Sequence, residues 1–144
     1  MVSKALDGPL NKLCGSSGSL QAEAFNADEY AGLLRSGFAR LVDAGNATLA
    51  LESRFDLAYN AAHALSFAAL RRMGYRSGNR YIVFQVLPHT LGLGPEVWRV
   101  LDKCHNIRNR GEYEGLLEVD KRLLNDLIAA TQAVKKAIES SPRS

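Results

Sequence analysis

The residues best suited to chemistry lie in one short stretch, where His105 precedes Arg108-Asn109-Arg110 and Tyr113 follows. Residues three apart share a helix face, so His105 and Arg108 can reach the same ligand if this stretch is helical. Guanidinium groups bind phosphate oxygens, and an imidazole or a phenol can hydrogen-bond a neighbouring hydroxyl or exchange a proton with it. The stretch therefore predicts a phosphodiester-binding site.

A structural role is the alternative interpretation of the same residues. Arg108 and Arg110 can instead pair with nearby carboxylates, and Tyr113 can pack as a half-buried aromatic. The carboxylates within reach along the chain are Glu112, Glu114 and Glu118. The stretch by itself leaves both interpretations open.

The surrounding segment is the most basic part of the chain. Residues 71–110 hold eight Arg or Lys and two Asp or Glu, a charge of +6, whereas the whole chain carries +3. Seven of the eight cations are arginine, which favours bidentate phosphate contacts, although a solvated surface would show a similar charge. The residues expected to contact a bound phosphate are Arg76, Arg80, Lys103, Asn109 and Arg110.

Composition narrows the class of protein. A chain of 144 residues that is 47% hydrophobic is long enough for one compact domain with a core. It has no apolar run long enough to span a membrane, and its first residues lack the apolar stretch of a secretory signal, so we expect a cytoplasmic protein. Cys14 and Cys104 are expected to be reduced. We expect no metal, because neighbouring Cys104 and His105 point in different directions on a helix. No cofactor is expected either, since Gly92-Leu93-Gly94-Pro95 lacks the lysine of a phosphate-binding loop.

The apolar spacing predicts helices throughout the main part of the chain. Asn26 is the expected cap of a first helix that ends at Gly45, and Thr48 the expected cap of a second helix that runs to Met73 and stops at Gly74. The alanine-rich second helix is expected to be central.

Three more helices are expected after Gly74. Residues 79–91 contain four consecutive strand-forming residues, but their continued spacing favours a helix that Pro88 kinks or shortens. Pro95 begins the fourth helix, which we expect to end near Arg108 or Arg110 with a turn after Gly111. The fifth is expected over residues 118–139.

Five helices without convincing strand pairs predict an all-α bundle. The expected organisation is a loose leader over residues 1–25, a helical domain over 26–140 and a frayed tail over 141–144.

Two parts of the chain resemble the HEPN superfamily. Residues 106–115, Asn-Ile-Arg-Asn-Arg-Gly-Glu-Tyr-Glu-Gly, are similar to the signature region of that family. Residues 59–70, followed by Gly74-Tyr75-Arg76, are similar to its alanine-rich second helix. The resemblance covers about residues 48–138 and implies a HEPN-like bundle with an up-and-down four-helix core plus an extra helix.

The resemblance also implies a function. Nuclease members carry an Arg, a polar residue and then a His, and two copies face each other in a homodimer to form a metal-independent endoribonuclease site. Carried over, Arg108 matches the Arg and Asn109 the polar residue, whereas the His position falls on Tyr113. A phenol with a pKa near ~10 is a poor base at neutral pH, so His105 is the other residue considered for proton transfer.

These observations predict a protein that binds RNA or a nucleotide phosphate, with catalysis left open. Catalysis, if present, is expected to be endoribonuclease activity that uses Arg108, Tyr113 and His105, and the resemblance implies a toxin–antitoxin or defence setting. The alternative is a non-catalytic helical interaction module. Its basic face would dock an acidic partner such as a nucleotidyltransferase or an antitoxin. A general small-molecule enzyme ranks last among the hypotheses.

Overall fold

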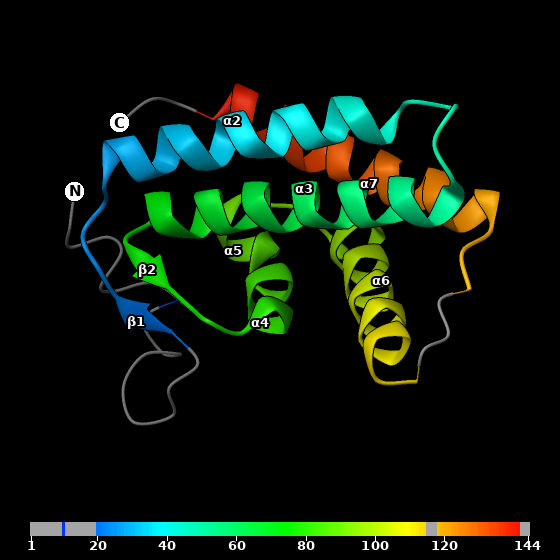
Figure 1. Ribbon diagram of the computed structural model, residues 1–144. Coiled ribbons are helices and arrows are strands. Elements are labelled where there is room, and N and C mark those ends of the chain that lie inside the picture. The colour runs from blue at the N-terminus through cyan, green and yellow to red at the C-terminus, as the bar shows by residue number, and fades with distance from the viewer. Residues whose placement is uncertain (1–9, 11–19, 115–117, 142–144) are drawn as a thin grey trace.

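The computed structural model describes residues 10, 20–114 and 118–141, and only the backbone of residues 112–114. Within these residues the chain forms six α-helices and a single pair of short strands (Figure 1). The predicted all-α class is therefore confirmed. Among the described helices, none is both long and apolar enough to cross a membrane.

Helix α2 (Ala27–Ala44) begins where the sequence predicts. The Asn26 side chain accepts a hydrogen bond from the Glu29 backbone N–H at 2.9 Å, which satisfies one of the unpaired donors of the first turn. The helix lies close to its neighbour at Gly37, where an added Cβ would be 2.6 Å from Leu65 Cδ2. A side chain at Gly37 would push α2 and α3 apart.

Helix α3 (Leu51–Arg72) is the central helix, as expected, and contacts each of the other helices. Its predicted cap is wrong, because Thr48 hydrogen-bonds the Asn46 side chain instead and the helix begins later. It ends as predicted, since Gly74 adopts the positive φ of 90° that glycine reaches without strain.

The segment after Gly74 is helical, as predicted, but it divides into α4 (Arg80–Gln85) and α5 (Leu87–Thr90). The break falls at Val86, and Pro88 lies in the first turn of α5, where a missing N–H is tolerated. The Asn79 side chain caps α4 by accepting from the Tyr81 backbone N–H at 3.0 Å.

Helix α6 (Pro95–Glu114) starts at the predicted proline but does not end where we expected. It continues through Gly111, which has no positive φ and so does not act as a left-handed stop. Helix α7 (Lys121–Ser140) begins after Asp120, whose carboxylate accepts from the Leu123 backbone N–H at 2.7 Å.

The expectation of no strand pairing is also wrong. Strand β1 (Gln21–Ala22) pairs antiparallel with β2 (Tyr75–Arg76). Leu10 and Leu20, both within the expected leader, are buried in a small second core beside this pair. The described part of the leader therefore packs onto the helices.

The arrangement of the helices gives α3 two different sides. Figure 1 shows α2 along one side of α3, with α4 and α6 together on the other and α6 steeply inclined to α3. The main core lies between α2, α3, α6 and α7. The polar residues of α3 that face α4 and α6 belong to the candidate site.

Candidate functional site

Arg108 lies on α6 and reaches across to α3. Its guanidinium carbon is 4.9 Å from the centroid of the Tyr59 ring, a distance at which a cation is attracted to the ring face. Its Nε atom is 3.4 Å from a carboxylate oxygen of Asp56, whose side chain is 58% exposed. A long contact to an exposed carboxylate contributes little, so the Tyr59 ring is the better-defined partner.

Tyr59 joins three helices. Its side chain is fully buried, and a second cation, Arg80 of α4, lies 5.7 Å from its ring centroid. Its hydroxyl oxygen is 2.7 Å from Nδ1 of His105 on α6. Tyr59 therefore collects Arg80, Arg108 and His105 around one aromatic side chain.

His105 is held at both ring nitrogens. Nδ1 faces the Tyr59 hydroxyl, and Nε2 is 3.1 Å from the side-chain nitrogen of Asn109, one helical turn along α6. With the Asn109 amide oriented to donate, a neutral imidazole carries its proton on Nδ1 and donates it to the Tyr59 oxygen. This arrangement fixes the ring orientation and makes Nε2 the hydrogen-bond acceptor.

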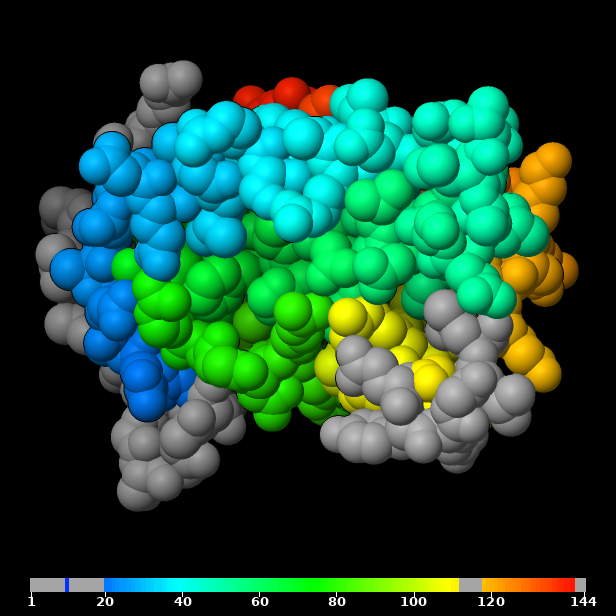
Figure 2. All heavy atoms as spheres, in the orientation of Figure 1, coloured from blue at the N-terminus to red at the C-terminus, as the bar shows by residue number. Residues whose placement is uncertain are grey.

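We call this set of residues the Arg108 cluster: Tyr59, Arg80, His105, Arg108 and Asn109. The elements that supply it, α3, α4 and α6, all reach the same face of the molecule (Figure 2). Tyr81, at the start of α4, lies beside it with a ring 6.2 Å from that of His105 and 37% exposed.

His63 reports on the electrostatics around the cluster. Its pKa is lowered to about 4, chiefly by burial and in addition by electrostatic interactions with Arg80, His105 and Arg108. Its ring stacks on Phe67 at 5.8 Å and meets the edge of Phe84. His63 is therefore a neutral, packed side chain at neutral pH, and the cluster beside it is electropositive.

The structure brings together four of the predicted site residues, Arg80, His105, Arg108 and Asn109. Lys103 and Arg110 are exposed on α6 and have no described contact to the cluster. The side chain of Tyr113 lies outside the described residues, although its backbone belongs to α6.

Arg76 lies in a separate group of charges at the strand pair. It binds both Glu23 and Glu29, and the same two carboxylates contact Arg71, which is only 1% exposed. Hydrogen bonds from Arg76 and Arg71 lower the pKa of Glu29, and the hydrogen bond to Glu29 raises that of Arg76. Arg76 is thus engaged in ion pairs away from the Arg108 cluster.

Sequence reasoning missed Tyr59, the residue that organises the cluster. A signal was present, because Asp56, Tyr59, Asn60 and His63 recur at three- and four-residue steps in a helix otherwise rich in alanine. Such spacing places them on one face, and three of these residues contact Arg80 or Arg108. The many alanines of this helix indicated a role in helix packing instead.

Cys104 does not add a reactive group to the site. It is buried, and burial raises the pKa of its thiol to about 12. Among the residues that the structure describes, no three His, Cys, Asp or Glu side chains gather to hold a metal ion. The side chains of the cluster itself, two guanidinium groups and an imidazole, can bind an anion and exchange a proton.

No protein-family model, no curated protein and no solved structure matches this chain.

Proposed function

We propose that the protein binds RNA or nucleotide phosphate groups at the Arg108 cluster. The observation that carries the proposal is the convergence of Arg80 and Arg108, from α4 and α6, on the single ring of Tyr59. Two guanidinium groups held at one place present a rigid set of N–H donors, which suits the oxygens of a phosphodiester.

The local field supports the same proposal. The cations next to His63 contribute to its lowered pKa, which is the effect expected of an electropositive site. The segment that supplies Arg80 and Arg108, residues 71–110, has a net charge of +6, whereas the whole chain has +3. Such a site attracts polyanions over a distance set by the salt concentration.

The resemblance to the HEPN superfamily adds a more specific version of this proposal. In that version two copies of the bundle face each other, and Arg108, with Asn109 beside it, is the residue that matches the family signature. The all-α fold supports it as far as the class of fold goes. The molecular mass of the protein in solution tests whether it forms this homodimer.

Binding is tested with a labelled single-stranded RNA whose anisotropy is followed at several salt concentrations. We expect the Arg80→Ala and Arg108→Ala variants to bind more weakly, and the slope of log K against log salt to become shallower by about 0.7 for each phosphate that the variant no longer neutralises. Arg122→Ala is the matched control, because Arg122 is exposed on α7. Unchanged affinity in the Arg80 and Arg108 variants would overturn the proposal. Capture of an acidic protein partner without RNA binding would favour an interaction module.

Cleavage of the bound RNA is a second proposal, and the fixed orientation of His105 favours it. The 2′-oxygen would attack phosphorus as the 5′-oxygen leaves, which gives a 2′,3′-cyclic phosphate and a new 5′-hydroxyl. The RNA 2′-hydroxyl would replace the Asn109 amide that contacts Nε2 of His105; Nε2 would then accept its proton, and Arg108 would stabilise the charge on the phosphorane oxygens. The leaving 5′-oxygen would take its proton from Tyr113, at the family's His position, and water would return a proton to the phenolate.

The cleavage assay uses bulk RNA in the presence of a chelator and detects cyclic-phosphate ends. We expect His105→Ala to abolish product while RNA still binds, because the two arginines remain. Product formation that is unchanged in His105→Ala would exclude this role. Absence of product from the unmodified protein would exclude cleavage and leave binding intact.

A further inference from the structure

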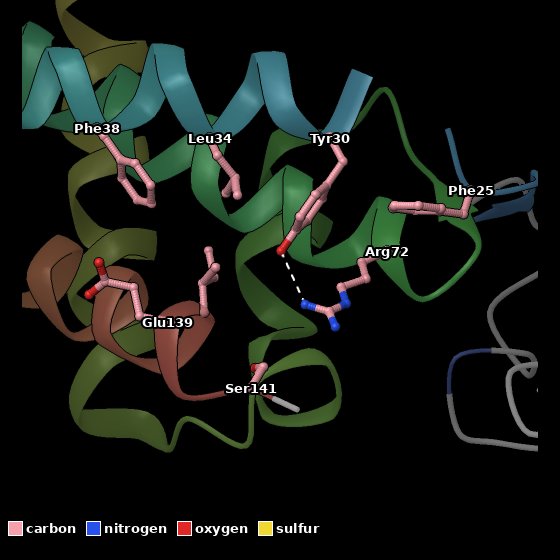
Figure 3. Close-up of a pocket in the computed structure, with 8 residues that line it drawn as sticks. Phe25, Tyr30, Leu34, Phe38, Arg72, Glu139 and Ser141 are labelled. Carbon is pink, nitrogen blue, oxygen red and sulfur yellow. Dashed lines mark hydrogen bonds between the residues drawn. The ribbon is translucent and has the colours of Figure 1, made fainter. Parts of the chain in front are cut away.

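A concave pocket lies away from the Arg108 cluster, between α2, the last turn of α3 and the end of α7. It has a volume of about 480 Å³, within the range of small-molecule sites. Figure 3 shows its walls. The lining residues are Phe25, Tyr30, Leu34, Phe38, Arg72, Ile138, Glu139 and Ser141.

One wall of this pocket is apolar. Tyr30, Leu34 and Phe38 are four residues apart along α2, so their side chains line up and point toward α7 (Figure 3). Ile138 of α7 is buried and contributes to the same lining. Phe25 extends the wall beyond the start of α2, with its ring 5.6 Å from that of Tyr30 and 49% exposed. A ligand with an apolar body would bury these surfaces.

Arg72 places a cation at one end of this wall. Its Nη1 atom is 3.4 Å from the Tyr30 hydroxyl, and its guanidinium carbon is 5.7 Å from the Tyr30 ring centroid. These contacts orient the guanidinium beside the pocket (Figure 3). A cation in the last turn of α3 also has a favourable interaction with the helix dipole.

The charges at the other end are different. Glu139 is an exposed carboxylate in the lining, and Lys135, one turn before it on α7, lies 5.3 Å from the Phe38 ring centroid. Opposite charges one turn apart offset each other, so the Phe38 end has no strong preference for an anion. The preference of the pocket for an anionic group therefore resides at Arg72.

We propose that this pocket binds a small amphipathic carboxylic acid. The carboxylate accepts hydrogen bonds from the Arg72 guanidinium and the Tyr30 hydroxyl, and an aromatic or medium-length aliphatic body lies along Leu34, Phe38 and Ile138. The pocket uses α2 and α7 where the Arg108 cluster uses α4 and α6. The two sites share only α3, so a ligand here occupies a place separate from the proposed RNA site.

The test uses 8-anilinonaphthalene-1-sulfonate, an aromatic anion that fluoresces in apolar surroundings, with decanoate as the competing acid. We expect decanoate to displace the dye and decyltrimethylammonium, which has the same tail and the opposite charge, to displace it much less. Arg72→Gln keeps most of the side-chain length and should weaken decanoate binding by about tenfold, because the variant cannot form the charge-assisted pair. Arg122→Gln, on an exposed arginine at the far end of α7, is the matched control and should bind normally.

A second measurement locates the ligand without relying on a variant. Decanoate added to isotope-labelled protein should shift the NMR signals of Phe25, Tyr30, Phe38 and Ile138, and Leu34→Phe, which fills the pocket, should remove both the shifts and the competition. The proposal is overturned if the shifts fall elsewhere, if Arg72→Gln binds decanoate normally, or if the ammonium compound competes equally well.

Discussion

Arg71 and Arg80 come from the same basic segment, yet their surroundings differ. Arg71 is buried at the strand pair, where it donates to Glu29 and to the backbone carbonyl oxygens of Glu23, Ala24 and Tyr75. Arg80 of α4 lies with Arg108 of α6 at the ring of Tyr59. Arg71 donates its hydrogen bonds to acceptors within the protein. Arg80 and Arg108 are instead held against the ring of Tyr59. The comparison separates a cation that holds the fold from cations suited to a ligand.

The largest effect is expected from Arg71→Met. The substitution leaves three carbonyl groups without the Arg71 donor and leaves Glu29 with Arg76 alone, so we expect the free energy of unfolding to fall by about 3–5 kcal/mol. Urea denaturation measures the loss. Arg71→Lys should restore little of it, because one ammonium cannot replace the guanidinium fork. A loss below about 1 kcal/mol would mean that the strand pair is held by its apolar contacts instead.

Lowering the pH should destabilise the protein through His63, beside the Arg108 cluster, and through Glu29, at the strand pair, in different pH ranges. The folded-state pKa of His63 is lowered to about 4 from an ordinary 6.5, so between these values the unfolded chain binds a proton that the folded chain does not. Stability is therefore lost as pH falls through this range, by at most about 1.4 kcal/mol per pH unit. His63→Gln should flatten that part of the curve.

Glu29 provides the contrasting case at the strand pair. Its folded pKa is lowered by Arg76 and Arg71, so its contribution is present above its ordinary value of 4.5 and is lost as pH falls further. Glu29→Gln should remove the loss below pH 4.5 and leave the His63 range unchanged. Denaturation curves at a series of pH values measure the free energy of unfolding of both variants. The prediction is contradicted if both variants change the stability over the same pH range.

The sequence predicted the helices better than it predicted the side chains that join them. Apolar spacing, Asn26 and Gly74 located α2 and the end of α3, because these signals act locally. Gly111 misled the prediction, since a glycine can remain in a helix and nothing local decides whether it stops one. The β1–β2 pair depends on contact between distant parts of the chain, which short-range patterns do not report.

The residues of the candidate site show the same difference between local signals and contacts made by helix packing. Helical spacing placed His105 and Arg108 on one face of α6, and Asn109 was expected beside Arg108 as its neighbour in sequence. Arg80 and Tyr59 reach them only through the packing of α3 and α4 against α6. Arg76 was grouped with Arg80 because of its charge, but Glu23 and Glu29 come from a distant part of the sequence to bind it.

Tyr59→Phe should have a moderate effect. It keeps the ring under Arg80 and Arg108 and removes the hydroxyl that contacts His105, so we expect a loss of about 1 kcal/mol in the free energy of unfolding. RNA affinity should be nearly unchanged, while any cleavage should slow because the imidazole loses its orienting partner. Tyr59→Leu, which also removes the ring, should weaken RNA binding. Equal affinity in the two variants would show that the ring does not position the arginines.

The smallest effect on stability is expected from Arg108→Ala, which also tests the comparison most directly. Its described ion pair is long and joins an exposed carboxylate, so we expect the free energy of unfolding to change by less than about 1 kcal/mol while RNA affinity falls. Arg76→Ala should leave RNA affinity unchanged, because Arg76 is engaged with Glu23 and Glu29. Denaturation and anisotropy on the same two variants give both quantities. If Arg108→Ala destabilised the protein as strongly as Arg71→Met, the Arg108 cluster would be a second structural clamp, and its arginines would not be reserved for a phosphate.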